Sequence, residues 1–321
     1  MSPRALVTGG GGFVGQWLAK ALLLRGTHVV AAGLGVPPRE SPALSHTEQD
    51  SVEWTELDVR HADDIDGVLA RVRPDVVYHL AGVSYIPDAQ DAPARAYDVN
   101  VLGAVRLLSA IARGRRAGDY DPKVLVVGSA MQYGRHAPEE MPLPETATQA
   151  PLTVYAATKA AQEVAALQAF RADGVRVVCT RSFNHSGPGH PPQFLLPALV
   201  RRALSLRESS ERVLAIGNAE SVRDYLHVHD VVSAYILLAE RGEAGEVYNV
   251  CSGEGVTARQ LAGDVLMQLG ITADISTDST LVRSADVNTL IGSPSKLQAL
   301  GWRRTRSRDE IIDDLIHAET H

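Results

Sequence analysis

The sequence predicts an α/β protein built on a doubly wound parallel sheet, with a smaller C-terminal α+β region. Three observations lead to this prediction. A glycine-rich stretch at residues 8–15 lies between a strand pattern and a helix pattern. Short runs rich in β-branched residues alternate with helix patterns through the first half of the chain. From about Asn184 the texture changes to loops rich in glycine and proline, followed by shorter elements.

The first strand pattern covers residues 5–8, and the helix pattern after it ends at Arg25 and Gly26, a basic last turn followed by a glycine stop. Glycines at positions 9, 12 and 15 fit a tight turn, a close approach of the backbone to a pyrophosphate, and packing of the helix on the strand. The helix N-terminus favours an anion there. This order predicts the dinucleotide site of a Rossmann sheet. Its candidate cofactor-binding residues are Gly9, Gly12, Phe13, Val14 and Gly15.

Further strand patterns follow in order, separated by helix patterns. They cover residues 29–32, 52–58, 76–80, 124–128 and 175–180, and the clearest helix patterns cover 99–112 and 156–172. We expect residues 1–183 to form a dinucleotide-binding domain, to which one or more segments within about 222–250 return. Residues 184–321 are expected to form mainly a substrate-binding domain over the carboxyl ends of the strands.

The composition excludes several functional classes. Hydrophobic residues make up 45% of the 321 and are spread evenly, which leaves no membrane span or secretory leader. The net charge of -7 argues against a nucleic-acid partner, and we interpret the basic clusters at 113–116 and 303–308 as solvated faces. Cys179 and Cys251 lie in apolar strand patterns and are expected to be buried thiols. We expect a cytoplasmic protein that acts on a small molecule.

Two features point to chemistry at the carboxyl edge of the sheet. Tyr155 and Lys159 are four residues apart in a helix pattern, so the phenol and the ammonium share a face. A cation favours the phenolate, but moving a tyrosine pKa from about 10 to about 7 requires roughly 4 kcal/mol, which needs a dehydrated cleft. Ser129 follows the strand pattern 124–128, where active sites of such sheets form. Taken singly, these features are more typical of a surface lysine and a turn serine.

Together these motifs resemble the extended short-chain dehydrogenase/reductase family, whose members mostly act on nucleotide sugars. The resemblance extends over essentially the whole chain. Its further matching segments are Asp58-Val59, Leu80-Ala81-Gly82, Asn100 before a helix pattern, Tyr133-Gly134, and Arg223-Asp224-Tyr225 before His227-Val228-His229-Asp230.

The resemblance implies a role for each matching residue. Tyr155 would be the general acid/base, Lys159 would hold the nicotinamide ribose and lower the tyrosine pKa, and Ser129 would hydrogen-bond the reacting oxygen. Further cofactor contacts are implied at Asp58, Val59, Leu80, Ala81, Gly82 and Asn100. Substrate contacts are implied at Ser84, Met131, Asn184, Arg223 and Arg283, the arginines on a diphosphate. For Arg223, an ion pair with Asp224 or Asp230 is the alternative.

Residues 181–189, 248–253 and 283–293 are similar to the family branch that handles GDP-linked hexoses. The family's 4,6-dehydratases carry a glutamate just after the catalytic Ser/Thr that removes the C5 proton, whereas this chain has Ala130, Met131 and Gln132 there. We therefore expect an NAD(P)H-dependent 4-ketoreductase of a nucleotide-linked 4-keto-6-deoxyhexose, GDP-linked rather than dTDP-linked. The open alternatives are an NDP-sugar 4-epimerase, then a 4,6-dehydratase, then a non-catalytic nucleotide-binding protein.

The cofactor type and the assembly are less directly encoded. The second strand pattern runs into Gly33-Leu34-Gly35 without the acidic residue typical of NAD enzymes, so NADP(H) is slightly favoured over NAD(H), with Arg39 as the candidate for the 2′-phosphate. His227 and His229 would share one side of a strand, but no metal is expected because the resemblance implies none. The alanine-rich helix pattern 156–167 suggests burial on more than one side. The resemblance implies a homodimer in which this helix joins the one at 99–112 in a four-helix bundle.

Overall fold

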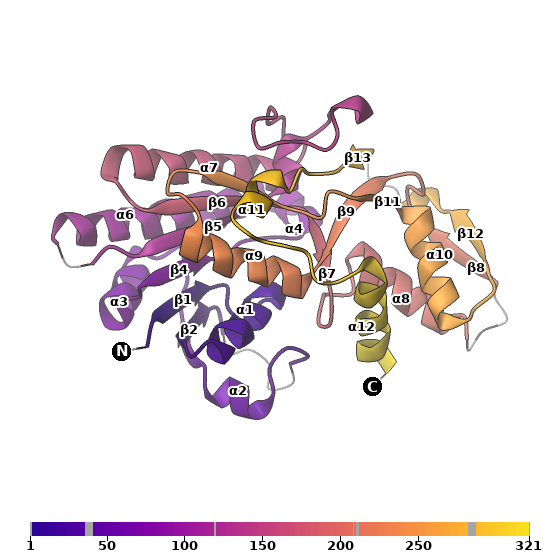
Figure 1. The fold of residues 1–321 in the computed structure, drawn as a ribbon, viewed down its shortest axis with the longest axis horizontal. Coiled ribbons are helices and arrows are strands. Elements are labelled where there is room, and N and C mark those ends of the chain that lie inside the picture. Colours follow the sequence, from indigo (N-terminus) through magenta and orange to yellow (C-terminus); the bar gives the residue numbers. More distant parts are fainter. Residues whose placement is uncertain are drawn as a thin grey trace.

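A computed structural model describes residues 2–35, 41–118, 120–207, 209, 212–281 and 287–320. Strands and helices alternate through its first half (Figure 1). In chain order the elements are β1 (Arg4–Thr8), α1 (Phe13–Leu24), β2 (His28–Gly33), α2 (His46–Asp50), β3 (Glu53–Glu56), α3 (Ala62–Val72), β4 (Val76–His79), α4 (Ile86–Asp91), α5 (Pro93–Tyr97), the π-helical turn η1 (Asp98–Leu102), α6 (Gly103–Arg116), β5 (Lys123–Ser129), the 3-10 turns η2 (Ala130–Tyr133) and η3 (Pro138–Glu140), α7 (Val154–Asp173) and β6 (Val177–Ser182).

The central sheet has seven strands in the order β10-β6-β5-β4-β1-β2-β3, and every neighbouring pair is parallel. Successive residues of the strands face opposite sides. Val7, Tyr78 and Leu125 pack with α1 and α9, whereas Leu6 and Val77 pack with α3, α6 and α7. Helices cover both faces of the sheet, which is why the inner strands β1 and β2 are rich in buried apolar residues. The predicted doubly wound Rossmann fold is confirmed.

The second half of the chain builds smaller sheets at one end of the molecule (Figure 1). Its elements are β7 (Asn184–Ser186), α8 (Leu195–Ser205), β8 (Val213–Ile216), β9 (Val222–His227), α9 (Val228–Arg241), β10 (Val247–Val250), β11 (Gly255–Thr257), α10 (Ala258–Leu269), β12 (Asp274–Thr277), η4 (Ser279–Leu281), β13 (Thr289–Leu290), α11 (Ser295–Ala299) and α12 (Arg308–Thr320). Strand β9 pairs with β7, β11 and β13, and β8 pairs with β12. Helices α8, α10 and α12 share a separate apolar core.

The segment 222–250 contributes to both parts. Strand β9 belongs to the small sheet, whereas α9 packs beside α1 and β10 pairs with β6 at the edge of the large sheet. The predicted division into two domains at residue 183 stays a prediction.

Two local expectations are corrected. His227 ends β9 and His229 lies in α9, so the two histidines do not alternate along one strand. The Nδ1 atom of His227 instead accepts a hydrogen bond from the His229 N–H at 3.1 Å, which caps α9. The helix pattern 99–112 divides into the π-helical turn η1 and α6.

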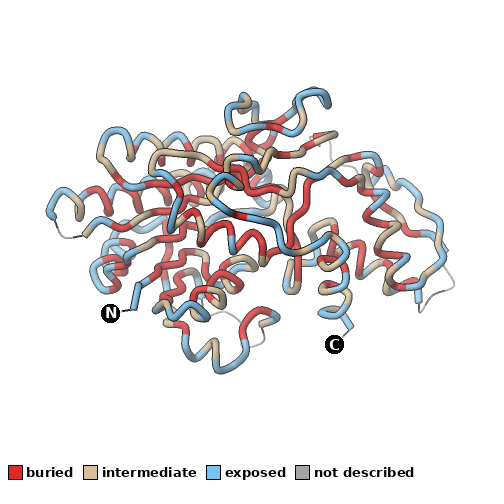
Figure 2. The backbone as a smooth tube through the Cα atoms, viewed as in Figure 1, coloured by how far each residue is buried: buried red, intermediate tan, exposed pale blue. Residues whose placement is uncertain are grey.

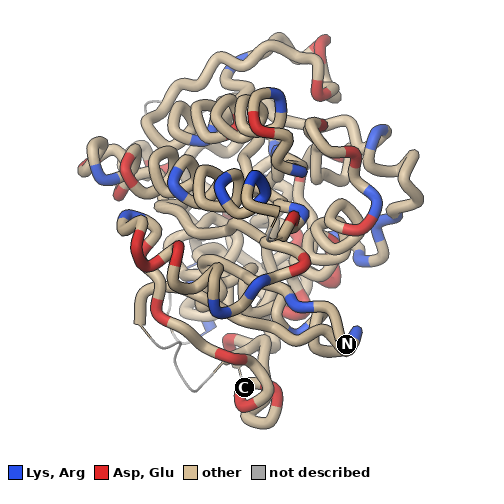
Figure 3. The backbone as a smooth tube through the Cα atoms, turned by 90° about the vertical axis from the view of Figure 1, so that its left-hand side faces the viewer, with Lys and Arg blue, Asp and Glu red and all other residues tan. Residues whose placement is uncertain are grey.

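The surface carries mixed charge. Lys and Arg are interspersed with Asp and Glu (Figure 3). In the basic cluster at 113–116, Arg113 pairs with Asp66 at 2.7 Å and Arg116 with Asp173 at 2.6 Å.

Buried backbone is concentrated in the sheet and the inner faces of the helices (Figure 2). Both cysteines are buried free thiols, as expected. Within the described residues, no helix has the length and apolarity needed to cross a bilayer.

A glycine is required where the chain turns after β5 and η2. Gly134 has φ 69°, and a Cβ there would overlap the carbonyl oxygen of Ala150. Gly270, with φ 63°, has open space around it. We expect Gly270→Ala to cost about 1 kcal/mol through its backbone conformation, and Gly134→Ala to cost a further 1–3 kcal/mol or so through overpacking. Urea unfolding of both variants tests this, and equal losses of stability would contradict it.

Candidate active site

The glycine-rich loop is shaped by close contacts. Gly9 has φ 71°, and a Cβ there would lie 2.8 Å from the N atom of Ala81. A Cβ at Gly15 would lie 2.5 Å from the carbonyl oxygen of Gly9. Helix α1 begins at Phe13, and no side chain caps it at Gly12. A loop without side chains that exposes uncapped N–H groups fits the pyrophosphate of a dinucleotide.

A hydrogen-bonded path runs from this loop along the end of β4. Thr8 Oγ1 bonds Nδ1 of His79 at 2.8 Å and accepts from the Ala81 N–H at 3.3 Å. A Cβ on Gly82 would lie 2.9 Å from Oδ1 of Asn100 and 3.5 Å from Nζ of Lys159. The segment Leu80–Gly82, predicted to lie along the cofactor, therefore joins the glycine loop to Lys159. Contacts of Leu80, Ala81 and Gly82 with a bound cofactor stay predictions.

Asn100 is fully buried in the π-helical turn η1 and holds two parts of the site together. Its Oδ1 accepts from the Val83 N–H at 2.7 Å, and its Nδ2 donates to Oγ1 of Thr158 at 2.8 Å. Oγ1 of Thr158 in turn donates to the carbonyl oxygen of Tyr155 at 2.7 Å. The residue predicted to contact the cofactor thus links the loop after β4 to helix α7. Such π turns are frequent at functional sites.

The predicted adenine contacts lie beyond β3. Asp58 accepts hydrogen bonds from N–H and Nε of Arg60 at 2.9 and 3.0 Å, and this guanidinium lowers the pKa of Asp58 to about 2. Val59 is buried beneath the start of α6, where a Cβ on Gly103 would lie 2.8 Å from Cγ2 of Val59. The carboxylate of Asp58 is therefore already hydrogen-bonded to Arg60, two residues further along the chain.

Ser129 ends β5, and Tyr155 and Lys159 lie in the first turns of α7. Thr153 caps this helix, since its Oγ1 accepts from the Ala156 N–H at 3.1 Å. Ser129 is 7% exposed, and its Oγ accepts from the Met131 N–H at 3.2 Å. A hydrogen bond from Ser129 to Tyr155 lowers the tyrosine pKa, although burial raises it more. The structure thus brings the predicted serine and tyrosine into contact.

Burial dominates the electrostatics of Tyr155 and Lys159. It raises the pKa of Tyr155 and lowers the pKa of Lys159 to about 8. Nζ of Lys159 donates to the carbonyl oxygen of Val127 at 2.9 Å and to Oε1 of Gln162 at 3.0 Å. Desolvation of the phenolate is the largest effect on Tyr155, so its pKa is raised overall in the protein by itself. The lowering of the tyrosine pKa by Lys159 stays a prediction. A phenol with a raised pKa keeps its proton at neutral pH.

The predicted substrate-binding residues are spread around this centre. Ser84 is exposed, Met131 packs against the apolar cluster around Tyr133, and Asn184 begins β7. Arg223 is 8% exposed in β9. The remaining predicted arginines, Arg39 and Arg283, lie outside the described residues.

Arg223 is held by main-chain carbonyl groups. Its Nη1 donates to the Val222 oxygen at 2.9 Å and to the Asn288 oxygen at 3.3 Å. The two aspartates considered as its ion-pair partners bind elsewhere. Asp224 accepts from the Ser252 N–H at 2.8 Å, and Asp230 accepts from the Thr305 N–H at 2.9 Å.

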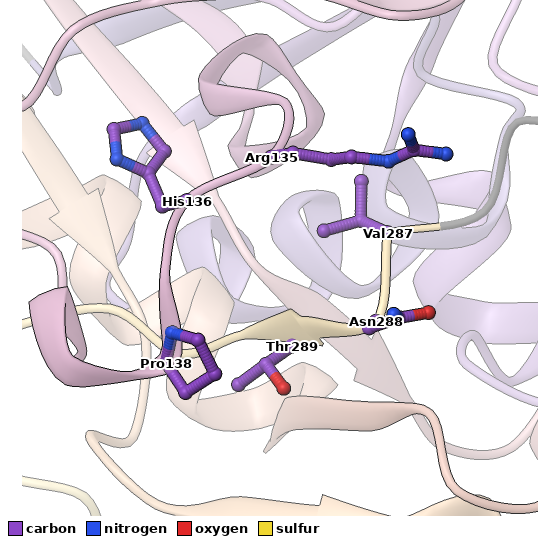
Figure 4. A pocket seen from close by; sticks show the side chains of 6 residues that line it. All are labelled: Arg135, His136, Pro138, Val287, Asn288 and Thr289. Atoms are coloured by element: carbon purple, nitrogen blue, oxygen red, sulfur yellow. The ribbon is translucent and has the colours of Figure 1, made fainter.

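A cavity of about 120 Å³ lies between the loop after η2 and the chain that leads into β13 (Figure 4). Its lining residues are Arg135, His136, Pro138, Val287, Asn288 and Thr289. Arg135 extends over Val287 in this view (Figure 4). The main-chain carbonyl oxygen of Asn288 also accepts a hydrogen bond from Arg223. The cavity therefore adjoins the arginine predicted to hold a diphosphate. The sequence patterns did not single out Arg135 or His136.

The loop 186–194 docks on the start of α1. The ring of His190 stacks between Phe13 at 4.8 Å and Phe194 at 4.5 Å, and Nδ1 of His190 bonds Oγ of Ser186 at 2.8 Å. Nε1 of Trp17 donates to the Pro188 oxygen at 3.0 Å. These contacts place the second part of the chain beside the glycine-rich loop. Over the described ranges, no three His, Cys, Asp or Glu side chains are arranged to hold a metal ion.

Three buried polar residues beside the site, Gln132, Glu163 and Arg181, were given no site role by the sequence analysis. Gln132 bonds the backbone of Ser129, and Glu163 pairs with Arg181 at 2.7 Å. Two signals were available. Residues 129–132 form the S-x-x-Q pattern of a capping box, and Glu163 lies four residues after Lys159 on the same helix face.

Comparisons with known proteins agree with this geometry. The model of a family described as GDP-mannose 4,6 dehydratase matches residues 6–315. The GDP-6-deoxy-D-mannose reductase of Pseudomonas aeruginosa is 34% identical over 307 residues, which cover 94% of this chain and 92% of that protein.

Solved structures share the whole fold. The structure of RMD from Pseudomonas aeruginosa complexed with NADPH superposes with a TM-score of 0.81 at 30% identity, covering 99% of this chain and 98% of that one. The UDP-glucose 4-epimerase of Thermus thermophilus complexed with NAD gives a TM-score of 0.84 at 28% identity, covering 98% of each chain.

The lowered pKa of Lys159 predicts a pH-dependent stability. Below about pH 8, Lys159 is protonated in both the folded and the unfolded protein. Between about pH 8 and its unfolded pKa of about 10.4, only the unfolded chain keeps the proton, so the free energy of unfolding rises with pH by up to about 1.4 kcal/mol per unit. We expect wild type to gain about 2 kcal/mol relative to Lys159→Met between pH 7.5 and 10. Urea unfolding at pH 7.5 and 10 measures the difference, and a constant difference would refute the shift.

Proposed function

The chain belongs to the GDP-mannose 4,6-dehydratase family, within the extended short-chain dehydrogenases/reductases, and we propose that it is a reductase of GDP-4-keto-6-deoxy-mannose. The enzyme uses a reduced nicotinamide cofactor and forms GDP-rhamnose or its C4 epimer. The relative at 34% identity, a GDP-6-deoxy-D-mannose reductase that this chain matches over 94% of its length, supports the reaction and the sugar.

One observation carries the choice of reduction over dehydration. The turn after Ser129 presents no carboxylate that could remove a C5 proton. Met131 packs in an apolar cluster, and the amide of Gln132 is bound to Ser129 and to Glu163. The carboxylate of Glu163 is itself paired with Arg181. Reduction of a ketone needs no such base, only a proton donor and an orienting hydroxyl.

Each residue of the site has a distinct role in the proposed reduction. The reduced nicotinamide supplies the hydride for C4 of the sugar. Tyr155 delivers its proton to the C4 oxygen, and its raised pKa keeps the phenol protonated for this step. Ser129 accepts from the Met131 N–H, which leaves its own hydroxyl proton for the same oxygen. Lys159 places a positive charge beside Gly82 and the cofactor path, where it stabilises the phenolate formed as the proton leaves.

A 4-epimerase is the second candidate, because the T. thermophilus UDP-glucose 4-epimerase has the same fold over 98% of this chain. An epimerase retains its oxidised cofactor through purification and catalyses no net oxidation. Tightly bound NAD in the isolated protein would favour it over the reductase.

NADP(H) is the proposed cofactor. Strand β2 ends at Gly33 and continues into Leu34 and Gly35, so no carboxylate there repels a 2′-phosphate. The RMD structure that superposes on this chain is complexed with NADPH. Arg39 stays the candidate for the phosphate, and a cytoplasmic location stays a prediction.

A homodimer through α6 and α7 is also proposed. The two helices lie side by side along one face (Figure 1). The alanine-rich α7 buries polar residues such as Lys159 and Glu163, whereas its Val164 is 65% exposed. Leu102, the last residue of η1, is 47% exposed, and Val105 of α6 is 37% exposed. A second copy of this face would cover these side chains.

The reaction is tested by mixing the protein with NADPH or NADH and freshly prepared GDP-4-keto-6-deoxy-mannose. We expect oxidation of one cofactor per sugar reduced, faster with NADPH. Tyr155→Phe removes the proton donor and is expected to lower kcat by about 100-fold or more, while leaving NADPH binding measured by fluorescence unchanged. Tyr248→Phe, on the edge strand β10, is the control. Full turnover by Tyr155→Phe would refute the role of the phenol.

The assembly is tested by light scattering at micromolar concentration. Wild type is expected at twice the chain mass of 34.4 kDa. Val164→Glu buries a charge in the proposed interface and is expected to give monomer. Met267→Glu replaces a 70% exposed side chain on α10 and is expected to leave the dimer intact. A monomeric wild type would exclude the proposed interface.

A further inference from the structure

Gln132 is a completely buried amide one turn after Ser129. Its Oε1 accepts from the Ser129 N–H at 2.8 Å. Its Nε2 donates to Oε2 of Glu163 at 2.9 Å and to Oε1 of Gln149 at 3.2 Å. Both ends of the amide are thus bound. A buried polar side chain that is satisfied in this way is restricted to one position.

The backbone beside Ser129 is shaped around this amide. A Cβ on Gly128 would lie 2.6 Å from Oε1 of Gln132 and would overlap the carbonyl oxygen of Thr180. Position 128 therefore has no room for a side chain while Gln132 holds its place. The glycine lies immediately before Ser129 and the glutamine three residues after it, and the two positions are packed against each other.

The far end of Gln132 is anchored to an ion pair. Glu163 and Arg181 have side chains 5% and 6% exposed, and Nε and Nη2 of Arg181 donate to the carboxylate at 2.9 and 2.7 Å. The guanidinium of Arg181 lies over the ring of Tyr133, 4.8 Å from its centroid. Its Nη1 donates to the main-chain carbonyl oxygen of Glu145 at 2.9 Å. The side chains of Glu163 and Arg181 are buried and joined by two hydrogen bonds, which restricts the pair to one geometry.

Glu163 lies on the same helix face as Lys159 and Tyr155, at successive intervals of four residues. The path from the Ser129 N–H through Gln132 to Glu163 therefore ends on the helix that carries the proton donor. It spans the gap between the end of β5 and α7, the two elements that bring the serine and the tyrosine together.

We propose that Gln132 is a positioning residue that fixes the Ser129 hydroxyl relative to the Tyr155 phenol through the Glu163–Arg181 pair. The capping-box bond to the Ser129 N–H orients the serine backbone, and the Met131 N–H occupies one lone pair of Oγ. Together they direct the hydroxyl toward the reacting oxygen. A misplacement of about 1 Å at such a site lowers the rate by about 100-fold. The inference rests on the proposed function only for its turnover measurement.

The experiment compares Gln132→Met with Gln149→Met. Gln149 donates to Oε1 of the same Glu163 and accepts the longer of the two bonds from Nε2 of Gln132. Gln149→Met therefore removes a hydrogen bond to the same carboxylate but leaves Gln132 bound to both Ser129 and Glu163. We expect Gln132→Met to lower kcat by about 10- to 100-fold, with KM and NADPH affinity within about twofold of wild type. Gln149→Met is expected to keep at least half of kcat at a similar loss of Tm. Equal loss of kcat in both variants, or full kcat in Gln132→Met, would overturn the proposal.

Gln132→Glu is the second variant, and it keeps the acceptor oxygen. Its carboxyl group can donate to Glu163 only while protonated, so its kcat is expected to fall as pH rises through its ionisation, relative to wild type. An unchanged pH profile would count against the proposal.

Crystal structures of wild type and Gln132→Met give a readout that needs no substrate. We expect Oγ of Ser129 to move away from the Tyr155 hydroxyl by about 1 Å in the variant, and an unmoved Ser129 would overturn the proposal. If wild type reduces no keto-sugar while this displacement is seen, the proposed function fails and the positioning role stands.

Discussion

The surrounding structure must supply hydrogen-bond partners for the polar residues on the inward face of α7. Buried polar side chains lie on successive turns of this face, and a buried polar group without a partner is costly. Nζ of Lys159 binds the end of β5, and the Glu163 carboxylate binds Arg181 of β6. Thr158 binds Asn100, which holds the loop after β4. Helix α7 is therefore positioned against three strand ends by polar contacts, in addition to the apolar packing that most sheet-covering helices use.

This arrangement places the acid chemistry in a dry environment. Burial raises the pKa of Tyr155 and lowers that of Lys159, so each group is driven toward its neutral form. The same burial strengthens the hydrogen bonds that remain, such as the one from Nζ of Lys159 to the Val127 carbonyl oxygen. A protonated tyrosine beside an oriented serine suits the delivery of a proton to a ketone oxygen. The glycine loop completes the site, because Gly9 packs directly on Ala81 and brings the pyrophosphate position to the end of β4.

The second part of the chain reaches the site through a few contacts. His190 stacks on Phe13 at the first residue of α1, and Arg223 binds Asn288 at the rim of the cavity that Arg135 lines. The first contact joins residues 177 positions apart in the chain (190 minus 13), and the second joins residues 65 positions apart. They explain why neither the stacking role of His190 nor the presence of Arg135 could be read from local patterns.

The sequence by itself determined the fold class, and it predicted the glycine loop and the Ser129, Tyr155 and Lys159 set. Each depends on local order: apolar strands, a fixed glycine spacing, and residues four apart on a helix. Tertiary structure alone decided the rest. The direction of the Tyr155 pKa, the cap made by His227 and the partners of Gln132 depend on burial and on groups distant in sequence. Desolvation and long-range hydrogen bonds arise only when the chain is packed, so no periodicity in the sequence records them.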